Sequence, residues 1–231
     1  ETLQRNCNYR NMSARLYEIG KIYLPGGPDG LANEPKMVTL GAYGEGMDFF
    51  VMKGAVEALL REIRAQDVSF QPCSSDPSYH PGRCAVIRAG GEQIGVIGQI
   101  HPLVARNYDV DAELYCAELS FDALLAAQGP GAEYTPLPRF PAVSRDIALV
   151  CREEITVGAL ERAIRRGAKG LLKQADLFDV YRGKGIDPGK KSVAFNLVLR
   201  ADDRSLTAEE ADEDVKSILA LLERELGAVL R

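Results

Sequence analysis

The sequence predicts an α+β protein of two domains, each built around an antiparallel sheet. Residues 128–138 are rich in proline and glycine and can neither continue a helix nor pair as a central strand, so we place a linker there. On both sides of it, short alternating runs typical of strands separate runs whose apolar residues recur at the helical spacing of three and four. The expected domains are therefore residues 1–127 and 139–231.

In the first domain we expect strands at 15–23 and 37–43, a helix at 48–64, strands at 84–89, 93–100 and 115–120, and a short helix at 121–128. Residues 25–30 contain two prolines and three glycines, which is typical of a surface loop. Asp48 can cap the first helix, because its side chain can accept a hydrogen bond from a free amide of the first turn. Gly90-Gly91 is a two-residue hairpin signal.

In the second domain we expect a strand at 146–151, a helix after Thr156, strands at 175–181 and 191–200 around a hairpin loop at 183–189, a second helix, and a short strand at 228–230. Thr207 and Glu210 form a capping box that opens the second helix, and Gly227 can end it. This β-α-β-β-α-β order is the ferredoxin-like arrangement, in which two helices cover one sheet face and leave the other open.

The apolar spacing also predicts which side chains of the second domain lie in the core between its helices and its sheet. On the strands these are Ile147, Leu149, Cys151, Phe195, Leu197 and Leu199, and on the helices Leu160, Ala163, Ile164, Ala211, Val215, Ile218, Leu222 and Leu226. The residues that alternate with them belong to the open face, and they include Tyr181, Asn196, Val198 and Arg200.

The composition is that of a globular protein, with 46% hydrophobic and 26% charged residues among 231. No apolar run approaches the roughly 20 residues of a membrane helix, so we expect no membrane partner. The chain begins at Glu1 without a leader, which indicates an internal piece of a longer protein. Five cysteines, an odd number without CxxC spacing, indicate free thiols and a cytoplasmic location.

The net charge of −5 hides an uneven distribution along the chain. Residues 1–133 carry a net charge of −6, residues 139–200 carry +6, and residues 201–231 carry −5. A polyanion responds to the charge within a Debye length of about 8 Å, so the basic stretch is a moderate indication of an RNA partner.

A search for catalytic constellations finds none. Gly44-Glu45-Gly46 begins a dinucleotide fingerprint, but Phe49 stands where its third glycine belongs. His80 and His101 lie beside prolines, in loop or strand-end contexts, and far from any pair of cysteines, so we expect neither catalysis nor zinc there. The carboxylates at 201–214 suit the start of a helix, and a magnesium cluster is the alternative.

The second domain offers a candidate surface for RNA. Basic residues gather at the predicted hairpin and strand ends, and an open sheet face with an aromatic ring, an amide and an arginine can stack on bases and contact phosphates. The candidates are Arg145, Tyr181, Arg182, Lys184, Lys190, Lys191, Asn196 and Arg200. The alternative is an ordinary exposed sheet face, where tyrosine and arginine are common.

Residues 134–231 resemble the ferredoxin-fold anticodon-binding domain of the bacterial phenylalanyl-tRNA synthetase beta subunit. The motifs are Phe140-Pro141-Ala142-Val143-Ser144-Arg145-Asp146, Leu177-Phe178-Asp179-Val180-Tyr181-Arg182-Gly183-Lys184-Gly185, Gly189-Lys190-Lys191-Ser192 and Arg204-Ser205-Leu206-Thr207. The first domain resembles the neighbouring catalytic-like module of that subunit. There the motifs include Arg15-Leu16-Tyr17-Glu18-Ile19-Gly20-Lys21, His80-Pro81-Gly82-Arg83 and Ile94-Gly95-Val96-Ile97-Gly98-Gln99-Ile100-His101-Pro102.

The resemblance implies a class II synthetase-like antiparallel sheet module followed by the ferredoxin-like domain. It implies an (αβ)2 enzyme that joins phenylalanine to tRNA-Phe with ATP and Mg2+, with catalysis in the alpha subunit and no cofactor in this chain. The first domain would pack against the alpha subunit, and the second would hold the anticodon stem-loop. Base or backbone contacts are expected above all from Arg145 and Tyr181, whereas Asp146 and Asp179 would organise arginines or turns.

Two other readings remain open on the sequence alone. A small-molecule regulatory module on a ferredoxin-like fold would require a buried polar pocket. A self-contained, single-chain synthetase would require the ATP-binding motifs of class II enzymes, and we find none of them in this sequence.

Overall fold

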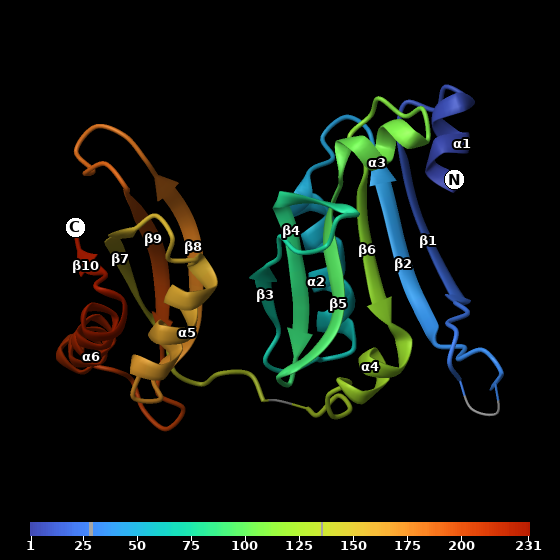
Figure 1. Ribbon diagram of the computed structural model, residues 1–231. Helices are drawn as coiled ribbons and strands as arrows, with labels where there is room; N and C mark the ends of the chain where they lie inside the picture. The colour runs from blue at the N-terminus through green and yellow to red at the C-terminus, as the bar shows by residue number, and fades with distance from the viewer. Residues whose placement is uncertain (28–29, 135) are drawn as a thin grey trace. The chain divides into compact units, whose positions relative to one another are not determined.

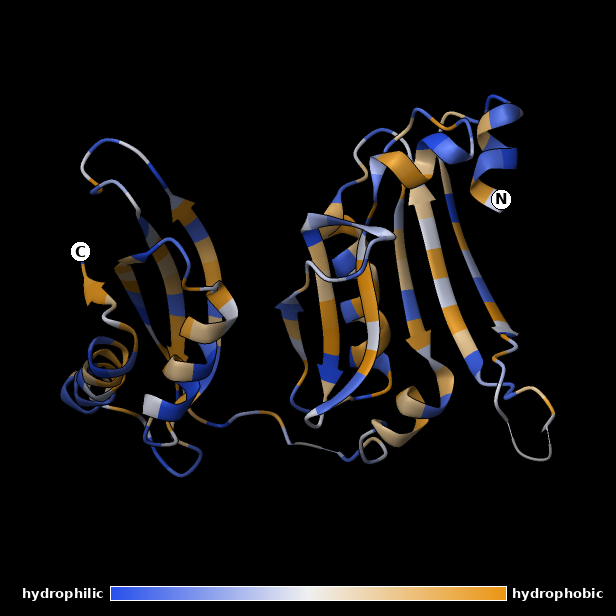
Figure 2. Cartoon of the chain, viewed as in Figure 1, coloured by the Kyte–Doolittle hydropathy of each residue, from blue (hydrophilic) through white to orange (hydrophobic). Residues whose placement is uncertain are grey.

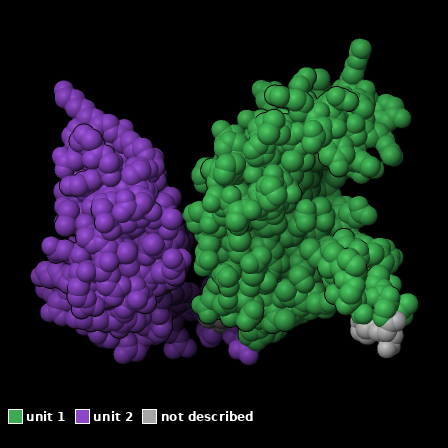
Figure 3. All heavy atoms as spheres, in the orientation of Figure 1, with its two compact units in different colours: residues 1–132 green, residues 133–231 purple. Residues whose placement is uncertain are grey.

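The computed structural model describes residues 1–27, 30–134 and 136–231. Pro28 and Asp29, in the loop predicted at 25–30, and Thr135, in the predicted linker, lie outside the described residues. The chain divides into two compact units, Glu1–Ala132 and Glu133–Arg231 (Figure 3). No helix within the described residues has the length and apolarity needed to cross a membrane.

Unit 1 contains a six-stranded antiparallel sheet with the strand order β1-β2-β6-β5-β4-β3 (Figure 1). The strands are β1 (Ala14–Lys21), β2 (Lys36–Tyr43), β3 (Ser69–Pro72), β4 (Tyr79–Ala89), β5 (Glu92–Ile100) and β6 (Tyr115–Ser120). The helices are α1 (Thr2–Asn8), α2 (Phe49–Glu62), α3 (Pro102–Asn107) and α4 (Phe121–Ala126). Antiparallel pairing throughout the sheet agrees with the α+β class expected from the sequence.

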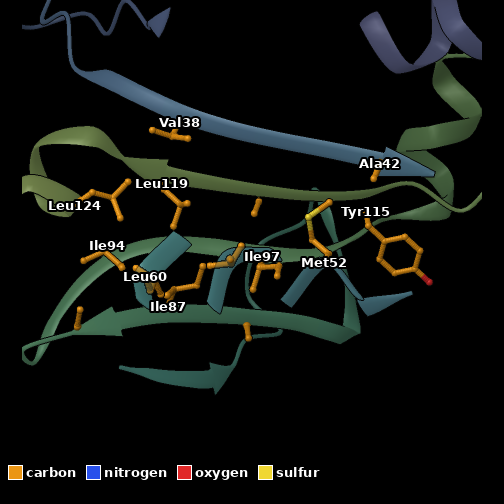
Figure 4. Close-up of a cluster of buried hydrophobic side chains, with 14 residues drawn as sticks. Val38, Ala42, Met52, Leu60, Ile87, Ile94, Ile97, Tyr115, Leu119 and Leu124 are labelled. Atoms are coloured by element: carbon orange, nitrogen blue, oxygen red, sulfur yellow. The ribbon is translucent and has the colours of Figure 1, made fainter. Parts of the chain in front are cut away.

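The core of unit 1 lies between α2 and one face of this sheet. Met52, Val56 and Leu60 of α2 pack against strand residues that include Ile87 and Ile97 (Figure 4). Each such fully buried side chain contributes about 1.5–3 kcal/mol relative to an exposed one. Asp48 caps α2 as predicted, because its Oδ1 accepts a hydrogen bond of 2.7 Å from the amide of Val51.

Unit 2 contains a four-stranded antiparallel sheet with the order β10-β7-β9-β8. Its strands are β7 (Val143–Arg152), β8 (Leu172–Tyr181), β9 (Lys190–Leu199) and β10 (Val229–Leu230), and its helices are α5 (Val157–Gly167) and α6 (Ala208–Leu226). Both hydrophobic and hydrophilic residues occur along these strands (Figure 2), and burial alternates along β7. The apolar set packs under both helices, and Leu149, Leu160, Phe195, Leu197 and Leu222 are fully buried.

Most of the predicted elements are confirmed, and the exceptions have physical causes. The capping box of Thr207 and Glu210 is present, and Gly227 ends α6 in the left-handed conformation at φ 60°. Helix α1 was missed because it has no side-chain cap and buries no residue, so it carries no apolar periodicity. Strand β3, with only four residues, and the six-residue α3 are too short for a periodic signal. Strand β4 begins at Tyr79 rather than at the predicted Cys84.

Candidate nucleic-acid interface

The open face of the unit 2 sheet is lined by polar side chains at its centre. Asn196 on β9 lies opposite Asp146 on β7 and Asp176 on β8. Its Nδ2 donates hydrogen bonds of 2.6 Å to Ser144 Oγ and to Asp146 Oδ1. These contacts hold the amide against β7 and leave its carbonyl oxygen available as an acceptor.

Tyr181 ends β8 on the same open face, because its register partner is Ser192. The hydroxyl donates to the carbonyl oxygen of Lys184 at 3.3 Å, and the Arg231 guanidinium lies 5.6 Å from the ring centroid. Gly183, at φ 152°, passes so close that a Cβ there would lie 2.9 Å from the tyrosine hydroxyl. The glycine therefore fixes the ring, which stays partly exposed, at the base of the hairpin loop.

The hairpin loop between β8 and β9 carries three of the predicted cations. Arg182 forms a bidentate pair with Glu153, at 2.6 Å from Nη2 and 3.0 Å from Nε to Oε1. Hydrogen bonds from Arg182 lower the pKa of Glu153, and Glu153 in turn raises the pKa of Arg182. Lys190 pairs with Asp187 at 2.9 Å, and this hydrogen bond lowers the pKa of Asp187. Among the described residues, Lys184 forms no ion pair.

Lys191 is a correction to the predicted surface. It alternates with Lys190 and therefore shares the helix-covered side of the sheet with Val193 and Phe195. Its side chain is 6% exposed, and its Nζ donates to the carbonyl oxygen of Glu153 at 2.8 Å. A buried ammonium that is already used to hold a loop cannot present its charge to a phosphate.

Arg145 and Arg200 do not join the hairpin cluster either. Arg145 pairs in register with Leu197, on the side of the helices, and its Nε donates to Asp212 of α6 at 2.9 Å. Arg200 directly follows the other end of β9. There its backbone amide donates a hydrogen bond to the carbonyl oxygen of Leu171. The length of β9 separates Lys190 from Leu199 by about 30 Å at roughly 3.3 Å per residue. The predicted residues thus form two groups rather than one.

Two arginines and one aspartate, Asp176, at this surface were missed. Arg152 pairs in register with Lys190, and Arg231 reaches across to Tyr181. The register also places Asp176 and Asp179 on the open face, so this face is mixed in charge rather than basic. The strand register could not be read from the sequence, because β8 contains an irregularity between Leu177 and Asp179.

A second exposed surface lies on unit 1 along the edge strand β1 (Figure 1). Tyr17 is 77% and Ile19 is 52% exposed, and Leu16 and Ile22 are exposed as well. A long edge strand with unpaired backbone groups and apolar side chains is a site for association with another chain.

The two histidines accept hydrogen bonds from the backbone. His80 Nδ1 accepts from the amide of Gly82 at 3.0 Å, and His101 Nδ1 accepts from Leu103 at 3.1 Å. Each ring therefore stabilises a turn at a strand end, which agrees with the structural role expected from the neighbouring prolines.

Both halves of the chain match known protein families. Residues 1–121, more than half of the chain, match the family described as the phenylalanyl tRNA synthetase beta chain CLM domain. The chain belongs to the phenylalanyl-tRNA synthetase beta chain family. Residues 138–231 match the ferredoxin-fold anticodon binding domain, which is the domain that the sequence motifs of the second half indicated.

Curated members of the phenylalanyl-tRNA synthetase beta chain family resemble the chain over its whole length. It is 38% identical over 232 residues to the phenylalanine–tRNA ligase beta subunit of Clostridium acetobutylicum and 40% identical to that of Clostridium tetani, and it is fully covered in both comparisons. The Geobacillus kaustophilus subunit is 41% identical over 94% of the chain. The chain spans about 29% of the length of the first two relatives and 28% of the third.

The donor set of this synthetase family member does not fit a metal site in the described parts of the chain. Residues 1–27, 30–134 and 136–231 bring together no group of three His, Cys, Asp or Glu side chains that could hold an ion. The carboxylates at 201–214, considered above for magnesium, are used in ion pairs: Asp202 with Lys173 at 2.7 Å and Glu210 with Arg204 at 2.6 Å.

Proposed function

We propose that this chain is a segment of the beta subunit of a phenylalanine–tRNA ligase that binds the anticodon stem-loop of tRNA-Phe and contacts the alpha subunit. Within the intact (αβ)2 enzyme of the cytoplasm, ATP and Mg2+ would serve aminoacylation at the alpha subunit, and this chain would carry no catalytic residue. The family of both units supports this proposal. The observation that carries it is the meeting of an aromatic ring, an amide and a basic loop on one open sheet face.

The tRNA surface is centred on Tyr181. An exposed tyrosine ring at the edge of a sheet can stack on an unpaired base, and Asn196 and the neighbouring carboxylates can accept hydrogen bonds from base edges. Arg182 and Lys184 lie in the loop next to the ring, Lys190 begins β9 at the end of that loop, and all three can contact the phosphates on either side of that base. Arg145 and Arg200, at the other end of the sheet, could contact only a more distant part of the stem.

The alpha-subunit surface is the edge strand β1. Its apolar side chains are exposed along most of its length, and its outer backbone groups have no partner strand in this sheet. A partner that adds a strand there, or covers the side chains, would bury an edge that otherwise promotes aggregation.

A fluorescence-anisotropy titration with the tRNA-Phe anticodon stem-loop, beside a scrambled loop and at several salt concentrations, tests the tRNA surface. We expect salt-dependent binding that favours the native loop. Lys190→Ala should flatten the slope of log affinity against log salt by about one unit, because one phosphate contact is lost. Lys216→Ala removes the same charge from the exposed face of α6 and should leave the slope unchanged.

Equal effects of Lys190→Ala and Lys216→Ala would place the tRNA surface elsewhere on unit 2. Equal affinity for the native and scrambled loops would reduce the proposal to non-specific binding of a polyanion. No binding at low salt would leave only the alpha-subunit contact.

A further inference from the structure

Two cysteines of unit 1 lie directly opposite each other on neighbouring strands. The register of β3 and β4 runs to the pair of Pro72 and Ala85, and the next step brings Cys73 against Cys84. The amide of Cys73 donates to the carbonyl oxygen of Cys84 at 2.9 Å. Hydrogen-bonded antiparallel pairs have Cα atoms about 5.5 Å apart, which lies within the usual span of a disulfide.

The two thiols differ in their surroundings in the way that a peroxide-reactive pair requires. Cys73 is partly exposed, and its sulfur lies 3.5 Å from Ser75 Oγ. Hydrogen bonds from the Ser75 side chain and then from the amides of Ser75 and Asp76 lower the pKa of Cys73. Cys84 is only 7% exposed, and burial raises its pKa to about 12. Cys73 is therefore the attacking thiolate and Cys84 the protected neighbour.

We propose that Cys73 and Cys84 form an oxidation site that takes hydrogen peroxide and closes a reversible disulfide. The Cys73 thiolate attacks one peroxide oxygen, the O–O bond breaks, and a sulfenic acid and hydroxide are formed. The Cys84 thiol then attacks the sulfenic sulfur. The S–S bond forms, the S–O bond breaks, and the thiol proton leaves with the hydroxyl group as water. The two sulfurs lose two electrons in total, and the peroxide is reduced to water.

Cys116 and Cys151 have surroundings that oppose this reaction. Burial, and after it the nearby charge of Glu118, raise the pKa of Cys116 to about 11. Burial also raises the pKa of Cys151, which is enclosed in the core of unit 2. A thiol held in its neutral form reacts slowly with peroxide, so oxidation should favour Cys73 and Cys84 over Cys116 and Cys151.

The disulfide would tie the end of an edge strand to its neighbour and close the loop between residues 73 and 84. This loop carries Asp76, whose Oδ1 accepts from the amide of Ser78, and leads to Tyr79, a buried ring whose hydroxyl donates to Glu118. Oxidation would therefore restrain the pairing with β4 through which β3 joins the sheet.

Peptide mapping after treatment with hydrogen peroxide tests this proposal on the 231-residue chain. Trypsin cuts after Arg64, Arg83 and Arg88, so the pair falls into two different peptides, 65–83 and 84–88. After alkylation of the remaining thiols, we expect the two peptides joined, with a mass about 2 Da below their sum, and separated again by dithiothreitol. The joined species should appear at least about tenfold faster than any modification of Cys116.

Two variants distinguish the steps, and a third is the control. Cys84→Ser should stop cross-linking and let a dimedone probe trap the sulfenic acid on Cys73. Cys73→Ser, at a partly exposed position, should leave both the fold and Cys84 unmodified, and Cys116→Ser should cross-link as the unaltered chain does. Circular dichroism checks that each variant is folded. Oxidation spread evenly over all five cysteines, or cross-linking of any other pair of peptides, would overturn the proposal.

Discussion

Lys190 and Lys191 are neighbours in sequence with opposite surroundings. Lys190 lies at the start of β9, exposed and paired with Asp187, whereas Lys191 lies among the buried residues below the helices. The alternation of strand residues decides this difference, since Lys191 has the same parity as Phe195 and Leu197. The same parity assigns Arg145 to the side of Ile147. That signal is present in the sequence, and applying it to charged residues would have removed Lys191 and Arg145 from the open face.

We predict that Lys191→Ala destabilises the chain by about 1–3 kcal/mol, because it removes packing and leaves the carbonyl oxygen of Glu153 without its donor. Lys190→Ala, at an exposed position, should change the free energy of unfolding by less than about 0.5 kcal/mol. Urea unfolding of both variants measures the difference. Similar stabilities would mean that the ammonium of Lys191 reaches solvent at little cost.

At the scale of elements, Asp214 connects α6 to the segment that follows α5. This side chain is 1% exposed, and its Oδ1 accepts a hydrogen bond of 2.5 Å from the amide of Lys169. Without the Asp214 carboxylate, the amide of Lys169, which lies just before β8, would lose its hydrogen-bond acceptor. A carboxylate on the buried stripe of a helix contradicts the apolar pattern expected there, and it marks a position where the backbone of another element needs an acceptor.

We predict that Asp214→Ala costs about 1–3 kcal/mol of stability, because the amide of Lys169 is left without an acceptor. Asp214→Asn keeps an oxygen in place and should cost clearly less. Chemical denaturation followed by circular dichroism compares the two. If asparagine were as damaging as alanine, the negative charge, rather than the hydrogen bond, would hold the connection.

Elements that carry a local sequence signal, such as a helix cap, could be predicted from the sequence. Elements that form only by pairing with another strand could not. The caps at Asp48, Thr156 and Thr207 follow from the polar residue before each apolar run. Strand β3 exists because it pairs with β4, and nothing within Ser69–Pro72 itself, least of all Pro72, favours a strand. The same holds for the candidate surface. The alternation of strand residues predicts that Tyr181 and Asn196 lie on the open face, whereas Arg231 reaches this surface through a contact with the Tyr181 ring that the sequence does not signal.

At the scale of the whole molecule, the two units differ in charge. Residues 1–132 carry −5, whereas in unit 2 the basic stretch 139–200 (+6) is offset by Glu133 and the acidic residues 201–231 (−5), so its net charge is zero. Each unit also has a hydrophobic core formed by its own residues. The proposed division of function therefore has a physical basis in both charge and packing.

We predict that residues 133–231, expressed alone, fold cooperatively and bind the anticodon stem-loop with the salt slope of the whole chain, because every candidate phosphate contact lies in this unit. Residues 1–132 alone should bind the alpha subunit and not the stem-loop. Anisotropy and size-exclusion chromatography measure the two activities. A smaller slope for the separated second unit would reveal phosphate contacts made by the first.

The ion pairs of the hairpin loop bear on how a tRNA bound as proposed would leave. Arg182 and Lys190 are already neutralised by Glu153 and Asp187, so an arriving phosphate takes the place of a carboxylate instead of meeting a bare cation. This exchange weakens the capture of polyanions that engage a single side chain and favours a ligand that displaces several carboxylates together. In the reverse direction, each carboxylate returns as its phosphate departs. Under the proposed function, this exchange of carboxylate for phosphate would let the loop bind a tRNA and release it again without leaving a bare cation.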